Sequence, residues 1–102
     1  MPTFEATPRF TTDLHRLSPA QRRRFRQAVN VFVEDLRAGH GTFRPGLRVK
    51  GVRVAPGVYE LTWSMGTGPA GRATWQYGTP VVPGEQHIVW RRIDTHDVLT
   101  GP

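Results

Sequence analysis

Residues 87–99 read His-Ile-Val-Trp-Arg-Arg-Ile-Asp-Thr-His-Asp-Val-Leu. The run is apolar and β-prone where it begins and follows Pro83-Gly84, so it predicts a strand. It ends in four charged or titratable side chains, Arg91, Arg92, His96 and Asp97. We therefore expect the last strand to bring a cationic cluster to one spot, although an ordinary edge strand with a solvated tip has the same pattern.

Two helices are predicted far upstream of this strand. Thr7-Pro8 offers an N-cap and a first-turn proline for a helix over 8–17. Ser18-Pro19-Ala20-Gln21 offers a serine cap, a proline at the first helical position and a capping-box glutamine. Apolar residues at helical spacing then extend this second helix over 19–38, and Gly39 ends it.

Five strands are expected around these helices. The first is short, Thr3 to Ala6, and the others are expected over 47–54, 58–64, 72–77 and the run from His87. Successive strands joined by short turns form an antiparallel meander with one face covered. The chain is thus expected to be one α+β domain over residues 1–102, in the order β-α-α-β-β-β-β, with an antiparallel sheet and a two-helix hairpin on one face.

Details of the turns follow from glycine and proline. Ala55-Pro56-Gly57-Val58 has the residues of a type II turn, and Gly51 is expected to mark a β-bulge. Period-two alternation in the third and fourth strands divides their side chains between two faces. The set expected to face the helices is Tyr59, Leu61, Trp63, Ala73, Trp75 and Tyr77. The set expected on the open face is Glu60, Thr62, Arg72, Thr74 and Gln76.

Composition narrows the possible partners. The 102 residues include no cysteine, which excludes disulfides and thiolate chemistry, and carry a formal net charge of +6 from thirteen arginines and one lysine. Such a charge is typical of a protein that binds a polyanion or an acidic protein partner, although a basic domain without such a partner has the same composition. The N-terminus lacks signal-peptide features and no apolar run approaches 18 residues, so we expect a cytoplasmic protein without a membrane association.

Four arginines, Arg22, Arg23, Arg24 and Arg26, lie near the start of the second helix, which is the positive end of its dipole. This unfavourable placement suggests an acidic partner or RNA. A solvated helix face explains it equally, because arginine is a good helix former.

The remaining chemistry points to phosphodiesters. His87, His96 and Asp97 lack the spacing of a zinc site, and the glycine-rich loop 66–71 lacks the Gly-Lys-Ser/Thr of a phosphate-binding loop. Arginine binds two phosphate oxygens at once, and histidine transfers protons near neutral pH. An open sheet face that carries Arg72 beside Arg48 and Lys50 is the expected ligand site.

Three stretches are distinctive together: Val58-Tyr59-Glu60-Leu61, Gly71-Arg72-Ala73 and residues 88–99. With them the sequence resembles the RelE/ParE superfamily of bacterial toxins, and within it the RelE/YafQ-like mRNA interferase branch. The end of the chain is similar to an R-x-G-S/T-H-x-x-L/F pattern, with Asp94 in place of glycine. Trp63 stands where many relatives have arginine.

The resemblance implies the toxin of a type II toxin–antitoxin system, a ribosome-dependent mRNA endoribonuclease that a cognate antitoxin silences. It implies attack of the RNA 2′-oxygen on phosphorus to give a 2′,3′-cyclic phosphate, without a metal or other cofactor. Arg72 then meets the scissile phosphate, His96 transfers a proton, and Arg91 belongs to the same catalytic set. The residues expected to contact the RNA backbone are Arg48, Lys50, Arg53 and Arg92.

Other interpretations stay open. His96 could be a turn residue, and Arg72 could pair with Glu60 across the hairpin. His15, His40 and His87 are interpreted as surface histidines. The same scaffold includes gyrase inhibitors and could include a degenerate, purely interacting relative. The sequence makes no prediction of oligomeric state.

Overall fold

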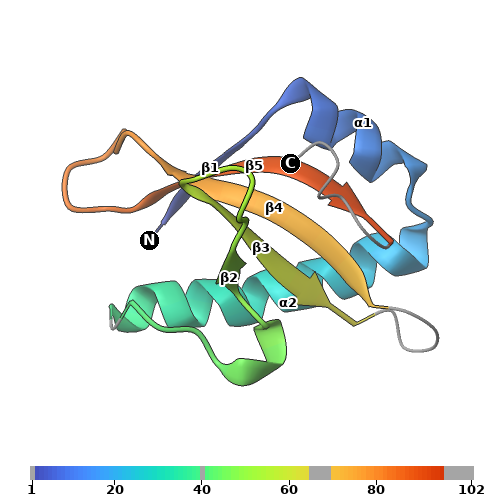
Figure 1. Ribbon diagram of the computed structural model, residues 1–102, viewed down its shortest axis with the longest axis horizontal. Coiled ribbons are helices and arrows are strands. Elements are labelled where there is room, and N and C mark those ends of the chain that lie inside the picture. The colour runs from blue at the N-terminus through green and yellow to red at the C-terminus, as the bar shows by residue number, and fades with distance from the viewer. Residues whose placement is uncertain (1, 40, 65–69, 96–102) are drawn as a thin grey trace.

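The computed structural model describes residues 2–39, 41–64 and 70–95 and has an α+β fold (Figure 1). The elements are β1 (Thr3–Ala6), α1 (Pro8–Arg16), α2 (Pro19–Ala38), a short 3₁₀ helix (Pro45–Leu47), β2 (Lys50–Gly51), β3 (Val58–Trp63), β4 (Gly71–Gly78) and β5 (His87–Asp94). Apart from the 3₁₀ turn, this is the predicted order of helices and strands along the chain.

The five strands form one mixed sheet in the order β1-β5-β4-β3-β2. Strand β1 runs parallel to β5, whereas the other pairs are antiparallel. The expectation of an antiparallel sheet is therefore wrong for the β1–β5 pair. The two helices carry the chain to the far edge at β2, and three antiparallel steps then bring β5 back beside β1 in the same direction.

Both helices begin and end where their capping residues indicate. The Thr7 side chain accepts a hydrogen bond from the Phe10 N–H at the start of α1. At the start of α2, Ser18 and Gln21 form the full capping box, with bonds of 3.1 Å and 2.8 Å. Gly39 ends α2 in the left-handed conformation (φ 73°), which favours glycine. The predicted bounds of α2 are confirmed.

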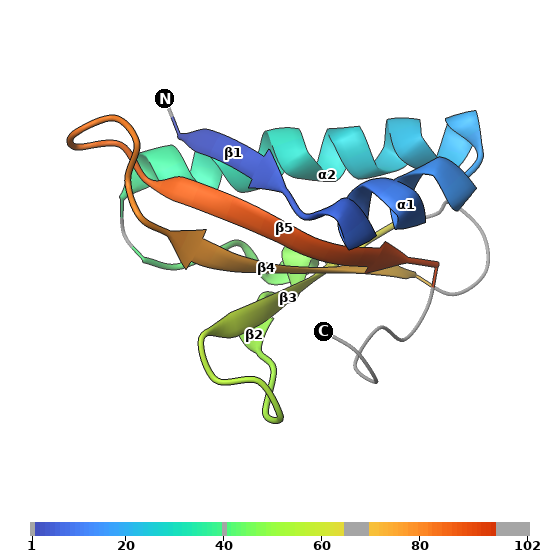
Figure 2. The ribbon, with the colours of Figure 1, turned by 90° about the horizontal axis from the view of Figure 1, so that it is seen from above.

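The core lies between α2 and the sheet, and Figure 2 shows both helices on the same side of the sheet. Phe32 is fully buried, with its ring centroid 4.9 Å from that of Trp75 and 5.5 Å from that of Trp90. Phe25 packs edge-on against Trp63 and Trp90. Aromatic pairs of this geometry add to the free energy gained from burial alone. The predicted inward face of β3 and β4 is confirmed for Leu61, Trp63, Ala73 and Trp75, which are all buried.

A β-bulge in β5 sets which face its side chains take. Trp90 is paired with Trp75 but Arg92 with Thr74, so Arg91 is an extra residue on its strand. The insertion lets Trp90 and Ile93, which are three residues apart, both join the core. The bulge was expected at Gly51, but Gly51 is paired in regular register with Tyr59.

The predicted strand over 47–54 is much shorter than expected. Residues 45–47 form a 3₁₀ turn, and Arg48 then has a φ of 47°, so only Lys50 and Gly51 extend alongside β3. The type II turn is supported, because Gly57 has a φ of 85° and the Val58 N–H donates to the Ala55 carbonyl at 3.0 Å. Across the described ranges, neither helix is long and apolar enough to cross a bilayer.

Candidate functional site

On the face of the sheet opposite the helices, charged side chains of β2, β3 and β4 form an ion cluster around a buried carboxylate. Nη1 of Arg72 lies 3.0 Å from Oε1 of Glu60, and Nζ of Lys50 lies 3.8 Å from the same oxygen. The Glu60 side chain is 1% exposed, whereas that of Arg72 is 36% and that of Lys50 is 64% exposed. A buried carboxylate is thus covered by two cations that reach solvent.

Strand register brings these residues together. Glu60 is paired with Lys50 on one side and with Thr74 on the other. Arg72 is offset by two residues and is paired with Thr62 and with Asp94. Side chains two apart on a strand share a face, so Glu60 and Arg72 meet diagonally across the β3–β4 hairpin. The sequence-based pairing of Arg72 with Glu60 is confirmed.

Only one oxygen of Glu60 is used by this cluster. Oε2 is buried and has no hydrogen-bond partner in the described part of the chain. An unpaired buried acceptor is destabilising by about 1–3 kcal/mol. A donor from a bound molecule can reach this oxygen only if the side chains that cover it move aside. Glu60 is the functional candidate that the sequence interpretation missed, because it was considered only as a partner of Arg72.

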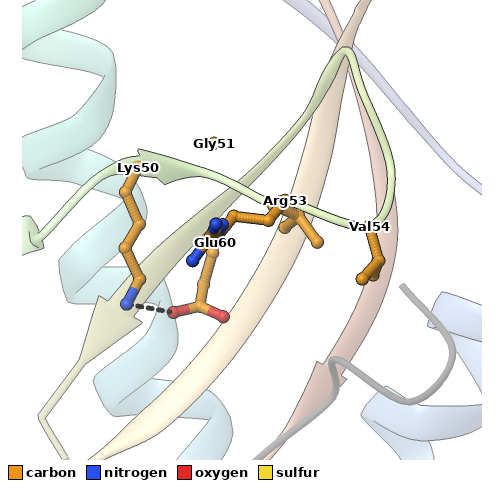
Figure 3. A pocket seen from close by; sticks show the side chains of 6 residues that line it. Lys50, Gly51, Arg53, Val54 and Glu60 are labelled. Atoms are coloured by element: carbon orange, nitrogen blue, oxygen red, sulfur yellow. Dashed lines mark ion pairs between the residues drawn. The ribbon is translucent and has the colours of Figure 1, made fainter.

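A pocket of about 410 Å³ opens beside this carboxylate. The residues that line it are Lys50, Gly51, Val52, Arg53, Val54 and Glu60. Figure 3 shows Lys50 reaching Glu60, with Arg53 extending into the pocket from the turn that follows β2. The pocket therefore combines one carboxylate with two flexible cations. Such a pocket suits a ligand that carries a phosphate group for the cations and a hydroxyl group that can donate to the carboxylate.

Local packing explains the glycine before Arg72. A Cβ atom on Gly71 would lie 2.2 Å from Cε2 of Trp63, so the indole ring covers this backbone and leaves no room for a side chain. Trp63 is 1% exposed and packs against Phe25. Trp63 is therefore part of the core and does not lie on the open face of the sheet.

Arg91 and Arg92 have different partners although they are adjacent. Nη1 of Arg91 donates to Oε1 of Gln76 at 2.5 Å, on the open face of β4. Nε of Arg92 donates to Oδ2 of Asp13 in α1 at 2.6 Å, beyond the edge of β5. The same Asp13 oxygen accepts from the Ile93 N–H at 3.2 Å. The two arginines were expected at one spot, but these contacts differ. Arg91 binds Gln76 on the open face, whereas Arg92 binds Asp13 of α1.

The Arg92 guanidinium is held tightly in this position. Its hydrogen bond to Asp13 raises its pKa, and charge interactions with Asp13 and Asp94 act in the same direction, against a smaller effect of burial. Asp94 is paired with Arg72 across β4 and β5 and lies near Arg92. It adds a negative charge to the β4–β5 end of the site.

Three further predicted residues have separate outcomes. Arg53 lines the pocket beside Glu60. Arg48 is exposed and follows the 3₁₀ turn in a left-handed conformation. His96 lies outside the described residues, as does His40, so their predicted roles stay predictions.

His87 is a buried residue, and its interpretation as a surface histidine is wrong. It is 5% exposed, with Nδ1 2.7 Å from Oγ1 of Thr3 and Nε2 2.7 Å from Oε1 of Glu5. Its ring also lies over Gly78, where a Cβ atom would come within 2.8 Å of Cδ2. The parallel pairing of Thr3 with His87 brings these groups together, and a sheet assumed to be antiparallel could not predict it.

The arginines of α2 also have a structural explanation in part. Nη1 of Arg22 donates to the Leu17 carbonyl at 2.6 Å and to the Leu14 carbonyl at 3.5 Å. Arg22 thereby satisfies carbonyl groups at the negative end of α1, which is the favourable end for a cation. Arg23, Arg24 and Arg26 are exposed, as the solvated-face interpretation expected.

Within the described ranges, no group of three or more histidine or acidic side chains is arranged to hold a metal ion. Comparison of the chain with protein-family models, with curated proteins and with solved structures finds no match. The two grounds for a function are therefore the geometry of the open face and the resemblance in the sequence.

Proposed function

We propose that this protein is an RNA-cleaving toxin of a type II toxin–antitoxin system, a ribosome-dependent mRNA endoribonuclease of RelE-like topology. One observation supports this most strongly. The buried Glu60 carboxylate has an oxygen without a partner among the described residues, forms ion pairs with Arg72 and Lys50, and lines a pocket together with Lys50 and Arg53. Cleavage of RNA by its own 2′-hydroxyl needs a base, a phosphate clamp and an acid, and we propose Glu60 as the base and Arg72 as the clamp.

The proposed reaction follows from these positions. The scissile phosphate binds to Arg72 and to the two flexible cations, which are partly or fully exposed and can reach solvent. Oε2 of Glu60 accepts the proton of the 2′-hydroxyl, and the 2′-oxygen forms a bond to phosphorus while the bond from phosphorus to the 5′-oxygen breaks. The leaving oxygen takes up a proton and becomes a 5′-hydroxyl, and the other product ends in a 2′,3′-cyclic phosphate.

Arg91 and His96 complete the proposed site. Arg91 donates to Gln76, which is paired with Val58 on the same β3–β4 hairpin as Glu60. It is placed to contact the next phosphate along the RNA. His96 is the proposed donor of the proton to the leaving oxygen, a role that depends on the resemblance and not on described contacts. Loss of a proton-transfer group typically lowers a rate by about 10²- to 10⁴-fold.

The proposed protein partner is a cognate antitoxin with an acidic segment. The formal net charge of +6 favours such a partner in the same way as it favours RNA. Salt screens charges separated by more than about 8–10 Å at 0.1–0.15 M ionic strength. A complex built on these charges is expected to weaken steeply as salt increases.

Primer extension on cellular mRNA after induction tests the proposed function. Wild-type protein is expected to produce new 5′ ends within coding regions and to stop growth, and His96→Ala is expected to do neither while it remains folded. Intact mRNA during growth arrest would contradict the proposal. If purified protein then inhibited DNA supercoiling by gyrase, the gyrase-inhibitor alternative would replace it.

A further inference from the structure

A second cationic groove lies at the opposite side of β5 from the pocket beside Glu60. It has a volume of about 340 Å³ and is lined by Pro8, Arg9, Thr12, Asp13, Arg16 and Arg92. Figure 2 shows α1 running alongside the end of β5, where this groove is formed. It contains three arginines and one aspartate, so two cations are in excess.

The single acidic group of this groove is already used within the protein. Asp13 is 6% exposed, and its carboxylate accepts from Nε of Arg92 at 2.6 Å and from the Ile93 N–H at 3.2 Å. Nη1 of Arg16 is 4.0 Å away, at the limit of an ion pair, and the Arg16 side chain is 74% exposed. The Asp13 charge is thus neutralised by Arg92, which leaves Arg16 available to a ligand.

Arg9 has no anionic partner within the described part of the chain. It is exposed, and it forms no ion pair or hydrogen bond with another side chain in residues 2–39, 41–64 and 70–95. It lies in the first turn of α1, which has no acidic residue, at the positive end of the helix dipole. A cation is unfavourable there unless a negative group binds beside it.

The spacing of the two exposed arginines suits an extended polyanion. Arg9 and Arg16 are seven residues apart, which is two helical turns, so both lie on one face of α1 about 10.5 Å apart along its axis. Among the described residues that line the groove, Pro8 is the only apolar one. An acidic peptide would need apolar contacts for stable binding, whereas a nucleic-acid backbone is bound mainly through its phosphates.

We infer that this groove binds the phosphate backbone of RNA beyond the cleavage site, so that the strand crosses the edge of β5 from the open face onto α1. The inference depends on the proposed function, because Arg91 and Arg92 connect the two surfaces by a single step along β5. Arg91 contacts Gln76 on the open face, and Arg92 contributes to the groove. Arg9 and Arg16 thus contact phosphates and Arg92, which Asp13 orients, completes the groove.

The test uses a variant with both exposed arginines neutralised, Arg9→Gln with Arg16→Gln. The matched control neutralises two exposed arginines of α2, Arg23→Gln with Arg24→Gln. Binding of a 12-nucleotide 2′-O-methyl RNA, which has no 2′-hydroxyl to attack, is followed by fluorescence anisotropy at several salt concentrations. Thermal melting checks that both variants remain folded, as expected for exposed side chains.

The slope of log K against log salt gives the number of phosphate contacts. Each cation that contacts a single strand contributes about 0.7 to it, so the α1 variant is expected to lose about 1.4 and the α2 control to keep the wild-type slope. An unchanged slope in the α1 variant, or an equal loss in both variants, would overturn the inference. Polyglutamate binding is measured on the same variant. If the α1 variant keeps the wild-type slope for RNA but no longer binds polyglutamate, the groove is a site for acidic peptides and the inference is overturned.

Failure of this inference is distinguishable from failure of the proposed function. If wild-type protein cleaves mRNA with ribosomes present, but it does not bind the 12-nucleotide RNA or the slope is unaffected by the α1 variant, only the groove assignment is wrong. If wild-type protein leaves mRNA intact with ribosomes present, the proposed function is wrong and the inference is wrong with it.

Discussion

Oε1 of Glu60 accepts from Nη1 of Arg72 at 3.0 Å, and the carboxylate that forms this pair is 1% exposed. The interaction is therefore not an ordinary surface ion pair, which contributes about 0–1 kcal/mol. Removal of either partner leaves a buried charged group poorly compensated. The pair joins β3 to β4, so the informative substitutions are those that keep the size or the charge of the side chain.

Arg72→Lys is expected to abolish RNA cleavage while the protein keeps its fold and its affinity for RNA. Lysine keeps the charge but cannot make the planar two-point contact of arginine with phosphate. Loss of such a transition-state contact typically lowers a rate by about 10²- to 10³-fold. Single-turnover cleavage and RNA affinity are measured on the same preparation, with Arg23→Lys as the control. A lysine variant that cleaves at the wild-type rate would assign Arg72 a structural role only.

Glu60→Gln is also expected to lower RNA cleavage without weakening RNA binding. The amide keeps nearly the same shape but is no base, so the cleavage rate is expected to fall by about 10²- to 10⁴-fold. RNA binding is expected to be unchanged or tighter, because a negative charge beside Arg72 and Lys50 is removed. Thermal melting is measured in parallel, since loss of the buried pair also lowers stability. A folded Glu60→Gln protein with full activity would exclude Glu60 as the base.

His87→Ala is expected to destabilise the protein by about 1–3 kcal/mol. The substitution removes the side chain that joins Thr3 and Glu5 of β1 to β5. It also leaves an empty space over Gly78, where the imidazole ring was. His15→Ala is the matched control, because His15 is exposed and surface changes stay within about ±0.5 kcal/mol. Urea unfolding of the two variants gives the comparison. Equal stabilities would mean that His87 does not hold β1 in place.

Asp35→Asn is expected to remove stability that the wild-type protein has at neutral pH and loses in acid. Hydrogen bonds from the Arg44 side chain and backbone lower the pKa of Asp35 below its ordinary value of 3.8. A carboxylate with a lowered folded-state pKa stabilises the fold above its unfolded pKa, and this contribution is lost as the pH falls through the folded value. The difference in Tm between wild type and variant is thus expected at pH 7 and should shrink below about pH 4. A difference that persists unchanged at pH 2.5 would contradict this origin.

The helices and the inward faces of the strands could be predicted because they depend on local patterns. Ser18, Gln21 and Gly39 mark the ends of α2 by capping chemistry, and Trp63 and Trp75 alternate with polar residues as a half-buried strand requires. The parallel β1–β5 pair could not be predicted in this way. It joins segments more than 80 residues apart, and nothing in the local sequence of Thr3–Ala6 specifies its neighbour.

The site could be predicted only in part for the same reason. Lys50 and Arg53 line one pocket with Glu60, and Arg72 forms an ion pair with the same carboxylate. The different partners of Arg91 and Arg92 could not be predicted, because Asp13 reaches the edge of β5 only through the way α1 packs. The burial of Glu60 depends on cross-strand register, so its free oxygen could not be inferred from the alternation of polar and apolar residues.

The most direct test of the proposed activity is the chemistry of the RNA ends that the purified protein produces with ribosomes present. Wild-type protein is expected to leave a 2′,3′-cyclic phosphate on one fragment and a 5′-hydroxyl on the other, and Glu60→Gln is expected to leave the RNA intact. Fragments that end in a 5′-phosphate and a 3′-hydroxyl, or uncut RNA together with inhibited gyrase, would contradict the account.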